Sequence, residues 1–261
     1  MVGYATGMKV DFGRTADDYA RYRVGFPEAL FARLDGYGIG RAGQRILDLG
    51  SGTGSLARGF ARRGARVTAL DLSEDLLAQA RALAAAEGVE IEILRAPAED
   101  TGLAEGAFDV VAAGQCWHWF DRPTAAREAR RLLASGGKLL ICHFDWIPLP
   151  GNMVAATERL IEAHNPAWTY GGLDGFHPAC LGDAARAGFA GIETFSFDTE
   201  VPYSHEAWRG RIRASAGVGG SLPDARVAAF DRALAALLAA DFPEQPLQVP
   251  HRAFAMIALA P

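Results

Sequence analysis

The chain has 261 residues, 50% hydrophobic and 22% charged, so it has the apolar fraction of a folded protein rather than a disordered one. Its 26 basic and 31 acidic side chains leave a net charge of −5, which argues against nucleic acid as the main partner. No apolar run reaches the roughly 18 to 20 residues of a membrane span, and the start Met1–Gly7 lacks the pattern of an export signal. Three widely separated cysteines fit neither a disulfide framework nor a clustered zinc site, so we expect a cytoplasmic protein.

The first forty residues are a turn-rich preface in which arginines alternate with aromatic residues, and we expect helices there with a break at Pro27. From Arg45 onward, short apolar runs alternate with segments of helical period, a pattern typical of a parallel sheet with crossover helices. The predicted strands are 46–49, 66–70, 91–94, 108–113 and 138–144, and the predicted helices are 53–63, 73–87 and 122–133.

The alternation loosens after residue 145. Residues 145–175 are too long and too rich in aromatic side chains for a plain connection, so we interpret them as an inserted cover with a helix near 155–163. The pattern then predicts a helix over 178–187, a strand within 191–197, helices over 206–214 and 224–238, and a closing strand over 251–260. No repeat or low-complexity linker divides the chain, so a single domain is expected.

A glycine-rich turn, Asp48-Leu-Gly-Ser-Gly-Thr-Gly54, joins the first strand to the first helix. Glycine tolerates positive φ and lets a ligand approach the backbone closely, although a turn needed only for packing is the simpler alternative. The dinucleotide fingerprint places its third glycine where this chain has Ser55, which argues against NAD or FAD. No Lys-Ser or Lys-Thr pair follows the glycines, so a phosphate-binding Walker loop is excluded.

Acidic residues follow the second and third predicted strands. Asp71 stands at the carboxyl end of the second strand beside the glycine turn, where a carboxylate can accept both hydroxyl protons of a ribose. Ala98-Glu99-Asp100 follows the third strand and is placed to face an adenine amino group. The combination favours a nucleoside site over a surface acid near a helix start.

These segments, with Phe108–Val111 on the fourth strand and Leu132–Leu140 leading into the fifth, resemble class I S-adenosylmethionine-dependent methyltransferases over about residues 40–145. The stretch Gln115-Cys-Trp-His-Trp-Phe120 and the preface around Tyr22 are similar to the branch that contains trans-aconitate methyltransferases. The resemblance implies an α/β fold: a Rossmann-like, mostly parallel seven-stranded sheet with helices on both faces and a reversed last strand. It also implies a helical cover from the N-terminus and from the insertion after strand five.

The resemblance further implies S-adenosylmethionine as cofactor and a division of the single domain into four parts. These are an N-terminal helical cap (1–40), a cofactor-binding core (41–145), a substrate-cover insertion (146–177) and the remaining core strands and helices (178–261). By the same resemblance, Asp48 and the glycines line the methionine and ribose side. The implied cofactor contacts are Tyr19, Arg23, Asp48, Gly50, Ser51, Gly52, Gly54, Asp71, Leu72, Ala98, Glu99 and Gln115.

Methyl transfer from a sulfonium is an in-line displacement, and a protonated acceptor such as a phenol also needs a base. His118 and His143 follow the fourth and fifth strands at the end where open α/β sheets bind ligands, so we name both as candidate bases, with structural roles as the alternative. Candidate acceptor-binding residues are the aromatics Trp117, Trp119, Trp146, Trp168 and Tyr170, some of which we expect to pack in the insertion's own core. Arg209, Arg211 and Arg213 are an alternative for an anionic acceptor.

We expect no metal, because Asp121, His143, Asp145 and His177 match no compact ligand motif. The predicted function is transfer of a methyl group to a small-molecule acceptor, most simply at oxygen. Alternatives are transfer to nitrogen or carbon, a non-catalytic module that binds an adenosyl ligand, and a nicotinamide-dependent oxidoreductase, which Ser55 disfavours. We expect neither nucleic acid nor membrane as a partner, and a monomer or homodimer.

Overall fold

A computed structural model describes residues 10–11 and 13–261, so the expectation about the start Met1–Gly7 lies outside the described residues. Two compact units are distinguished by their internal contacts. We call residues Gly25–Phe144, His177–Ser196 and Ala253–Pro261 the sheet unit. The described residues up to Val24, with Asp145–Phe176 and Phe197–Arg252, form the helical unit.

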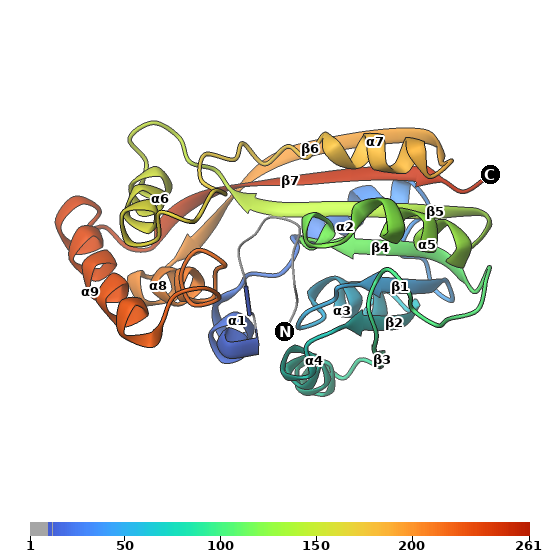
Figure 1. Ribbon diagram of the computed structural model, residues 1–261, viewed down its shortest axis with the longest axis horizontal. Helices are drawn as coiled ribbons and strands as arrows, with labels where there is room; N and C mark the ends of the chain where they lie inside the picture. The colour runs from blue at the N-terminus through green and yellow to red at the C-terminus, as the bar shows by residue number, and fades with distance from the viewer. Residues whose placement is uncertain (1–9, 12) are drawn as a thin grey trace. The chain divides into compact units, whose positions relative to one another are not determined.

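The strands form a seven-stranded sheet in the order β3-β2-β1-β4-β5-β7-β6 (Figure 1). Their bounds are β1 Arg45–Leu49, β2 Arg66–Asp71, β3 Glu92–Arg95, β4 Phe108–Gly114, β5 Leu133–Trp146, β6 Ala190–Tyr203 and β7 Leu247–Leu259. The pairs β1–β2, β1–β4, β2–β3 and β4–β5 are parallel. Backbone hydrogen bonds join Gly136 to Ala260 and Ile147 to Pro250, so β7 runs antiparallel to β5. The predicted mostly parallel sheet with a reversed last strand is confirmed.

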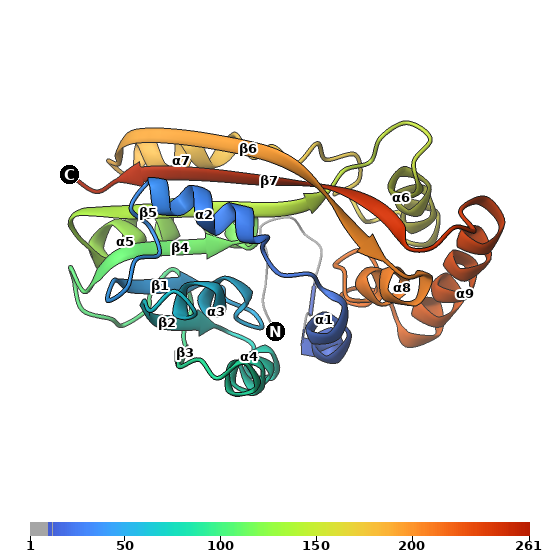
Figure 2. The same ribbon diagram turned by 180° about the vertical axis from the view of Figure 1, so that it is seen from behind.

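Helices pack on both faces of the sheet unit because alternate strand residues are apolar on each side. Helices α5 (Arg122–Leu132) and α7 (Ala179–Arg186) lie in front of the sheet in Figure 1. Helices α2 (Glu28–Gly36) and α3 (Ser55–Ala61) lie in front in Figure 2, seen from behind. On the first face, Leu47 and Leu49 share one apolar core with the alanines of α5. On the other, the rings of Phe31 and Phe60 meet edge to face at 5.4 Å.

The ends of helix α4 (Glu74–Glu87) lie where the sequence predicts them. The Ser73 hydroxyl accepts a hydrogen bond from the Leu76 N–H at 3.4 Å, and Gly88 ends the helix in the left-handed region at φ 65°. Pro27 likewise stands at the start of α2, as the predicted break requires. The cap at Ser73 fixes where α4 begins after β2, and Asp71, the last residue of β2, lies just before that cap.

The helical unit contains α1 (Ala16–Tyr22), α6 (Met153–His164), α8 (His205–Arg213) and α9 (Asp224–Asp241), with a short 3-10 turn at Gly13–Thr15. Arg213 joins three helices of this unit: from α8 it forms ion pairs with Asp18 of α1 and Asp231 of α9, each at 2.8 Å. The buried Trp208 donates through its indole N–H to the Thr157 hydroxyl of α6 at 3.1 Å. The unit is therefore held by polar bonds between helices as well as by apolar packing.

Strands β5 and β6 are longer than predicted. The sequence placed a turn at Ser135-Gly136-Gly137 before a strand over 138–144, whereas β5 runs continuously from Leu133 to Trp146. The turn is present as an irregularity within the strand: Phe108 pairs with Leu133 and Val110 with Lys138, and Gly136 has φ 76°. Glycine therefore marks an interruption of the ladder here rather than the start of the strand.

Among the described residues, no helix combines the length and the apolar character needed to cross a membrane.

Candidate functional site

The glycine turn between β1 and α3 adopts backbone conformations that few other residues tolerate. Gly50, Gly52 and Gly54 have φ of 60°, 56° and 76°. A Cβ atom on Gly50 would lie 2.9 Å from the side chains of both Cys116 and Phe120. Glycine at position 50 is therefore required by close packing against the loop after β4, and the positive φ values of all three glycines set the path of the turn.

Asp48 lies at the base of this turn and is only 1% exposed. Its Oδ2 accepts a hydrogen bond from the Ala57 N–H at 3.1 Å, while its Oδ1 has no hydrogen-bond partner among the described residues. Burial raises the pKa of Asp48 to about 8; the Ala57 N–H opposes this shift and the nearby Asp71 carboxylate adds to it. The buried Ser51 hydroxyl is also unpartnered within the described part of the chain. Unsatisfied polar atoms at one turn fit a polar ligand that supplies their missing hydrogen bonds.

Asp71 points toward the glycine turn rather than away from it. One carboxylate oxygen accepts from the Gly52 N–H and the other from the Ser73 N–H, both at 2.9 Å. Burial raises the pKa of Asp71 despite these backbone bonds. Each oxygen has a second acceptor site, so the carboxylate can still receive hydroxyl protons from a ligand.

The residues expected to flank an adenine follow β2 and β3. Leu72 is 38% exposed, Ala98 is buried, and the Glu99 carboxylate accepts the Asp121 N–H at 2.9 Å. The Arg95 guanidinium donates to the Leu72 carbonyl at 3.1 Å. An apolar side chain thus remains exposed after β2, while Glu99 is tied to the loop before α5.

Gln115, expected to close the site, has an unusual backbone. Its φ of 62° is positive, which is uncommon for a residue with a side chain. Its N–H donates to the Cys142 carbonyl at 2.8 Å, and its side-chain amide donates to the Phe144 carbonyl. Gln115 therefore holds the loop after β4 against the end of β5, in a strained conformation of the kind found at functional sites.

The two candidate bases are neighbours in the sheet unit. His118 lies in the 3-10 turn Trp117–Trp119 and is half-buried, whereas His143 on β5 is buried. Their ring centroids are 5.8 Å apart, and the His118 ring tilts against Trp119 at 4.7 Å. The structure thus brings together two histidines that are 25 positions apart in sequence.

The aromatic residues divide into different environments. Trp117 is 2% exposed, lies in the core and donates its indole N–H to Asp183 at 3.0 Å, which favours packing over acceptor contact. Trp119 is partly buried against the same core. In the helical unit Trp168 is buried and Tyr170 half-buried, as expected for aromatics that pack the insertion. Their roles toward an acceptor stay predictions.

In the helical unit, Trp146 belongs to a cluster of aromatic and basic side chains. Its indole N–H donates to Glu158 at 2.8 Å, and the Arg211 guanidinium lies 4.6 Å from its ring centroid. The Arg23 guanidinium, which also acts on Arg211, lies 4.6 Å from the ring centroid of Tyr19, so these two residues of the preface contact each other.

The three arginines of α8 have different partners. Arg209 and Arg213 form ion pairs with Asp231, and Arg213 also pairs with Asp18. Arg211 instead is buried beside Trp146, and burial lowers its pKa to about 10, with Arg23 contributing as a like charge. Helical periodicity places Arg211 on a different face of α8 from Arg209 and Arg213. It did not predict the other members of this cluster, Tyr203 and His251, whose ring centroids are 6.1 Å apart.

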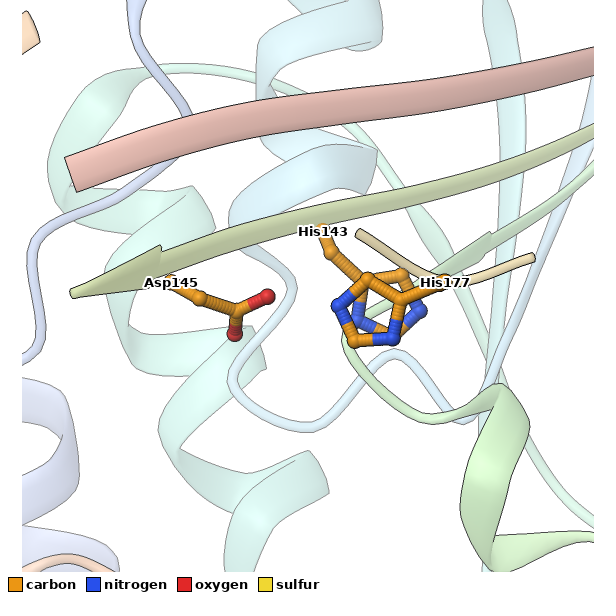
Figure 3. Close-up of side chains that lie close together, drawn as sticks. All are labelled: His143, Asp145 and His177. Atoms are coloured by element: carbon orange, nitrogen blue, oxygen red, sulfur yellow. The ribbon is translucent and has the colours of Figure 1, made fainter. Parts of the chain in front are cut away.

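Of the four residues considered as metal ligands, three come together. Asp121 caps α5 and accepts from the Thr124 hydroxyl at 3.0 Å. His143, Asp145 and His177 have ligand atoms within 4.8 Å of one another, and the two imidazoles stack at 3.4 Å (Figure 3). Our expectation of no metal rested on sequence spacing alone, and spacing does not reveal that these three side chains meet.

The amino-acid sequence is similar to those of known methyltransferases. Residues 47–141 match the model of a family described as a methyltransferase domain. A ubiquinone biosynthesis O-methyltransferase of Xanthomonas axonopodis pv. citri is 32% identical over 190 residues, which cover 72% of this chain and 75% of the relative.

Solved structures share the fold at lower identity. A crystal structure of a methyltransferase from Bacillus halodurans, described there as putative, aligns with a TM-score of 0.59 and 20% identity, covering 89% of this chain and 99% of that one. Phosphoethanolamine N-methyltransferase 2 of Haemonchus contortus, solved with S-adenosyl-L-methionine, aligns with a TM-score of 0.57 and 20% identity, covering 96% and 56%. The matching methyltransferase domain and the 32% identical relative, together with the glycine turn and its two acids, show that the chain belongs to the class I S-adenosylmethionine-dependent methyltransferases.

Proposed function

We propose that this enzyme transfers the methyl group of S-adenosylmethionine to an oxygen atom of a small-molecule acceptor. The observation that supports the donor side most directly is the pair of acids at one glycine turn, Asp48 at its base and Asp71 bonded to its Gly52 N–H. In the proposed arrangement Asp71 receives the ribose hydroxyls, and Asp48 and Ser51 face the methionine portion. Leu72, Ala98 and Glu99 flank the adenine, and Gln115 borders the same end of the sheet.

We propose His118 as the general base. When an acceptor hydroxyl attacks the methyl carbon, the carbon–sulfur bond breaks, its electron pair passes to sulfur, and the hydroxyl proton moves to the imidazole. His118 is suited to this role because it is half-buried in a short turn and is oriented by contacts with Trp119 and His143. The proposed contribution of His143 is to lie beside this base at the end of β5.

The choice of oxygen is supported by the ubiquinone O-methyltransferase relative, whose name states O-methylation. Nitrogen or carbon acceptors are the alternatives, and a module that binds the adenosyl ligand without turnover is the alternative from another class. A half-buried histidine next to the sheet's ligand-binding end favours an enzyme over such a module.

We also propose that the acceptor carries a negative charge, as in the branch that contains trans-aconitate methyltransferases. The support comes from Arg211, a buried guanidinium that stacks on Trp146 instead of pairing with Asp231 as its neighbours Arg209 and Arg213 do. A second guanidinium, Arg23, adds positive charge to this cluster. A planar guanidinium binds a carboxylate through two parallel hydrogen bonds, which suits an anionic group on the acceptor.

The cellular location proposed is the cytoplasm, because three cysteines far apart in the sequence do not suit the disulfide framework of an exported protein. The partners proposed are the small-molecule acceptor and, at most, a second copy of the chain.

The test is turnover with S-adenosylmethionine labelled in its methyl group. The purified enzyme is incubated with panels of phenols, carboxylic acids and amines, and products are identified by mass spectrometry. Label in an oxygen-linked product supports the proposal, label only on nitrogen or carbon selects the alternative, and cofactor binding without labelled product supports the binding module.

The base assignment has its own test once an acceptor is found. His118→Ala is expected to lower kcat about 100-fold or more with little change in KM, because proton transfer is lost while acceptor contacts remain. The matched control is His164→Ala in α6, whose ring packs against Phe230 far from the proposed base in sequence. Equal kcat in the wild type and His118→Ala would remove His118 from this role.

A further inference from the structure

Two imidazoles and one carboxylate meet at the end of β5. His143 is buried on that strand, and Asp145 follows two positions later, so both side chains project from the same face of a continuous strand. His177 lies directly before α7, and its ring stacks on that of His143 with centroids 3.4 Å apart and planes 11° apart. Figure 3 shows the Asp145 carboxylate turned toward the two rings.

The donor atoms of this group are close enough to share one ion. One ligand atom from each of the three residues lies within 4.8 Å of the other two. Two ligands of a tetrahedral zinc ion, each 2.0–2.2 Å from the metal, are separated by about 3.3–3.6 Å, so the donor atoms must move closer together and the two stacked rings must turn until the in-plane lone pair of each nitrogen points at the ion. The χ2 angle of histidine is broad, which makes such rotations inexpensive.

The chemistry of the donors selects the kind of ion. Imidazole nitrogen is a poor ligand for magnesium or calcium, which prefer oxygen, but it suits zinc, iron, cobalt and nickel. Two imidazoles with one carboxylate form a ligand set that leaves a coordination position open for water or another oxygen.

The backbone around the group is held in place. The Cys142 carbonyl, next to His143, accepts the Gln115 N–H at 2.8 Å, and Cys142 pairs with Gly114 across the β4–β5 ladder. The His177 ring also contacts the buried Phe254 of β7, with centroids 5.8 Å apart. Ligands fixed by a sheet lose little freedom on binding an ion, which favours affinity.

We propose that His143, Asp145 and His177 bind one divalent transition-metal ion, with zinc as the reference ion. His143 then acts as a ligand and not as a second base, whereas His118, 5.8 Å away by ring centroids, is left to accept a proton. The open coordination position would take an oxygen of the acceptor and favour its ionised form; this last role rests on the proposed function.

The experiment uses full-length untagged protein, stripped with a chelator and titrated with Co²⁺ and Zn²⁺ in the absence of S-adenosylmethionine. We expect one ion per chain by calorimetry and visible cobalt absorption bands of a low-coordinate site. His177→Ala and Asp145→Asn are each expected to weaken binding at least 10-fold, while His164→Ala leaves it unchanged. Binding that is absent in the wild type, or equal in all variants, overturns the proposal.

A second measurement needs no variant. X-ray absorption at the zinc edge of the wild-type complex is expected to show two imidazole ligands, and a shell of oxygen alone would contradict the assignment. Because both measurements omit cofactor and acceptor, their failure leaves the proposed methyl transfer untouched. Conversely, a protein that binds zinc at this group but transfers no methyl group would refute only the proposed function.

Discussion

The carboxylate of Asp71 accepts the Gly52 N–H at 2.9 Å, across 19 positions of sequence. This bond joins the end of β2 to the glycine turn after β1, and the Ser73 N–H holds the other carboxylate oxygen at the start of α4. A single side chain therefore fixes the geometry of the turn and also presents the remaining acceptor sites of its oxygens. The proposed cofactor site depends on both functions.

Replacing Asp71 with alanine is expected to raise the Kd for S-adenosylmethionine about 10- to 100-fold. The physical reason is the loss of charge-assisted hydrogen bonds worth about 1.5–3 kcal/mol. Calorimetric titration measures the change, and Asp75→Ala, an exposed acid in the first turn of α4, is the matched control. An unchanged Kd in a correctly folded Asp71→Ala protein would contradict the assignment.

Gly50→Ala is expected to destabilise the fold by about 2–5 kcal/mol, combining the cost of a positive φ with that of overpacking. A Cβ at this position would lie 2.9 Å from Cys116 and Phe120, which have a buried and a partly buried side chain. Gly102→Ala is the control, because Gly102 also has a positive φ, 69°, but no atom lies within 4 Å of its added Cβ. Urea unfolding of both variants separates steric crowding from backbone strain; equal losses would show that crowding contributes nothing.

Periodicity and turn chemistry predicted the sheet and most helix ends because these depend on local signals. Ser73 and Gly88 define α4 by capping, and Gly50 to Gly54 define the turn by backbone freedom. The length of β5 was underestimated, since the β4–β5 ladder pairs on both sides of the interruption at Gly136. β6 also extends beyond its predicted end, to Tyr203.

The contacts between residues distant in sequence could not be predicted in this way. The stack of His143 on His177 joins positions 34 apart, and no sequence period specifies that two side chains from a strand and a loop will meet. Likewise, Arg211 is buried beside Trp146 rather than paired with Asp231, because the rotation of α8 turns Arg209 and Arg213 toward that acid instead. Such contacts follow from tertiary packing. The sequence pattern shows which face of a helix or strand is apolar, but it does not show which side chains that face will contact.

Asp48→Asn is expected to stabilise the protein without cofactor increasingly as pH rises from 5 to 8. In the unfolded chain an aspartate ionises near pH 4, whereas burial holds the pKa of Asp48 at about 8 in the folded protein. The contribution of Asp48 to stability is therefore fully present below pH 4 and is lost as pH rises toward 8, by at most about 1.4 kcal/mol per pH unit. Asparagine has no such dependence.

Urea unfolding at several pH values measures this difference, and Asp109→Asn provides a control of opposite sign. The Arg45 guanidinium holds the pKa of Asp109 below its usual range, so the contribution of that carboxylate is present at neutral pH and is lost on acidification. A stability difference between wild type and Asp48→Asn that is constant with pH would show that Asp48 ionises normally.

Binding of S-adenosylmethionine is expected to release a proton from Asp48. The cofactor brings a sulfonium and an ammonium group, and a positive charge near a buried carboxyl favours its ionised form, so the pKa of about 8 should fall when the cofactor binds. At pH 7 most Asp48 side chains hold a proton before binding, and the release should approach one proton per site. Calorimetry in buffers of different ionisation enthalpy counts these protons. Protons released by the cofactor's own amino group are the same in the wild type and in Asp48→Asn, so the difference between the two proteins gives the release from Asp48. Equal proton release in the two proteins would place the cofactor's positive charge away from Asp48.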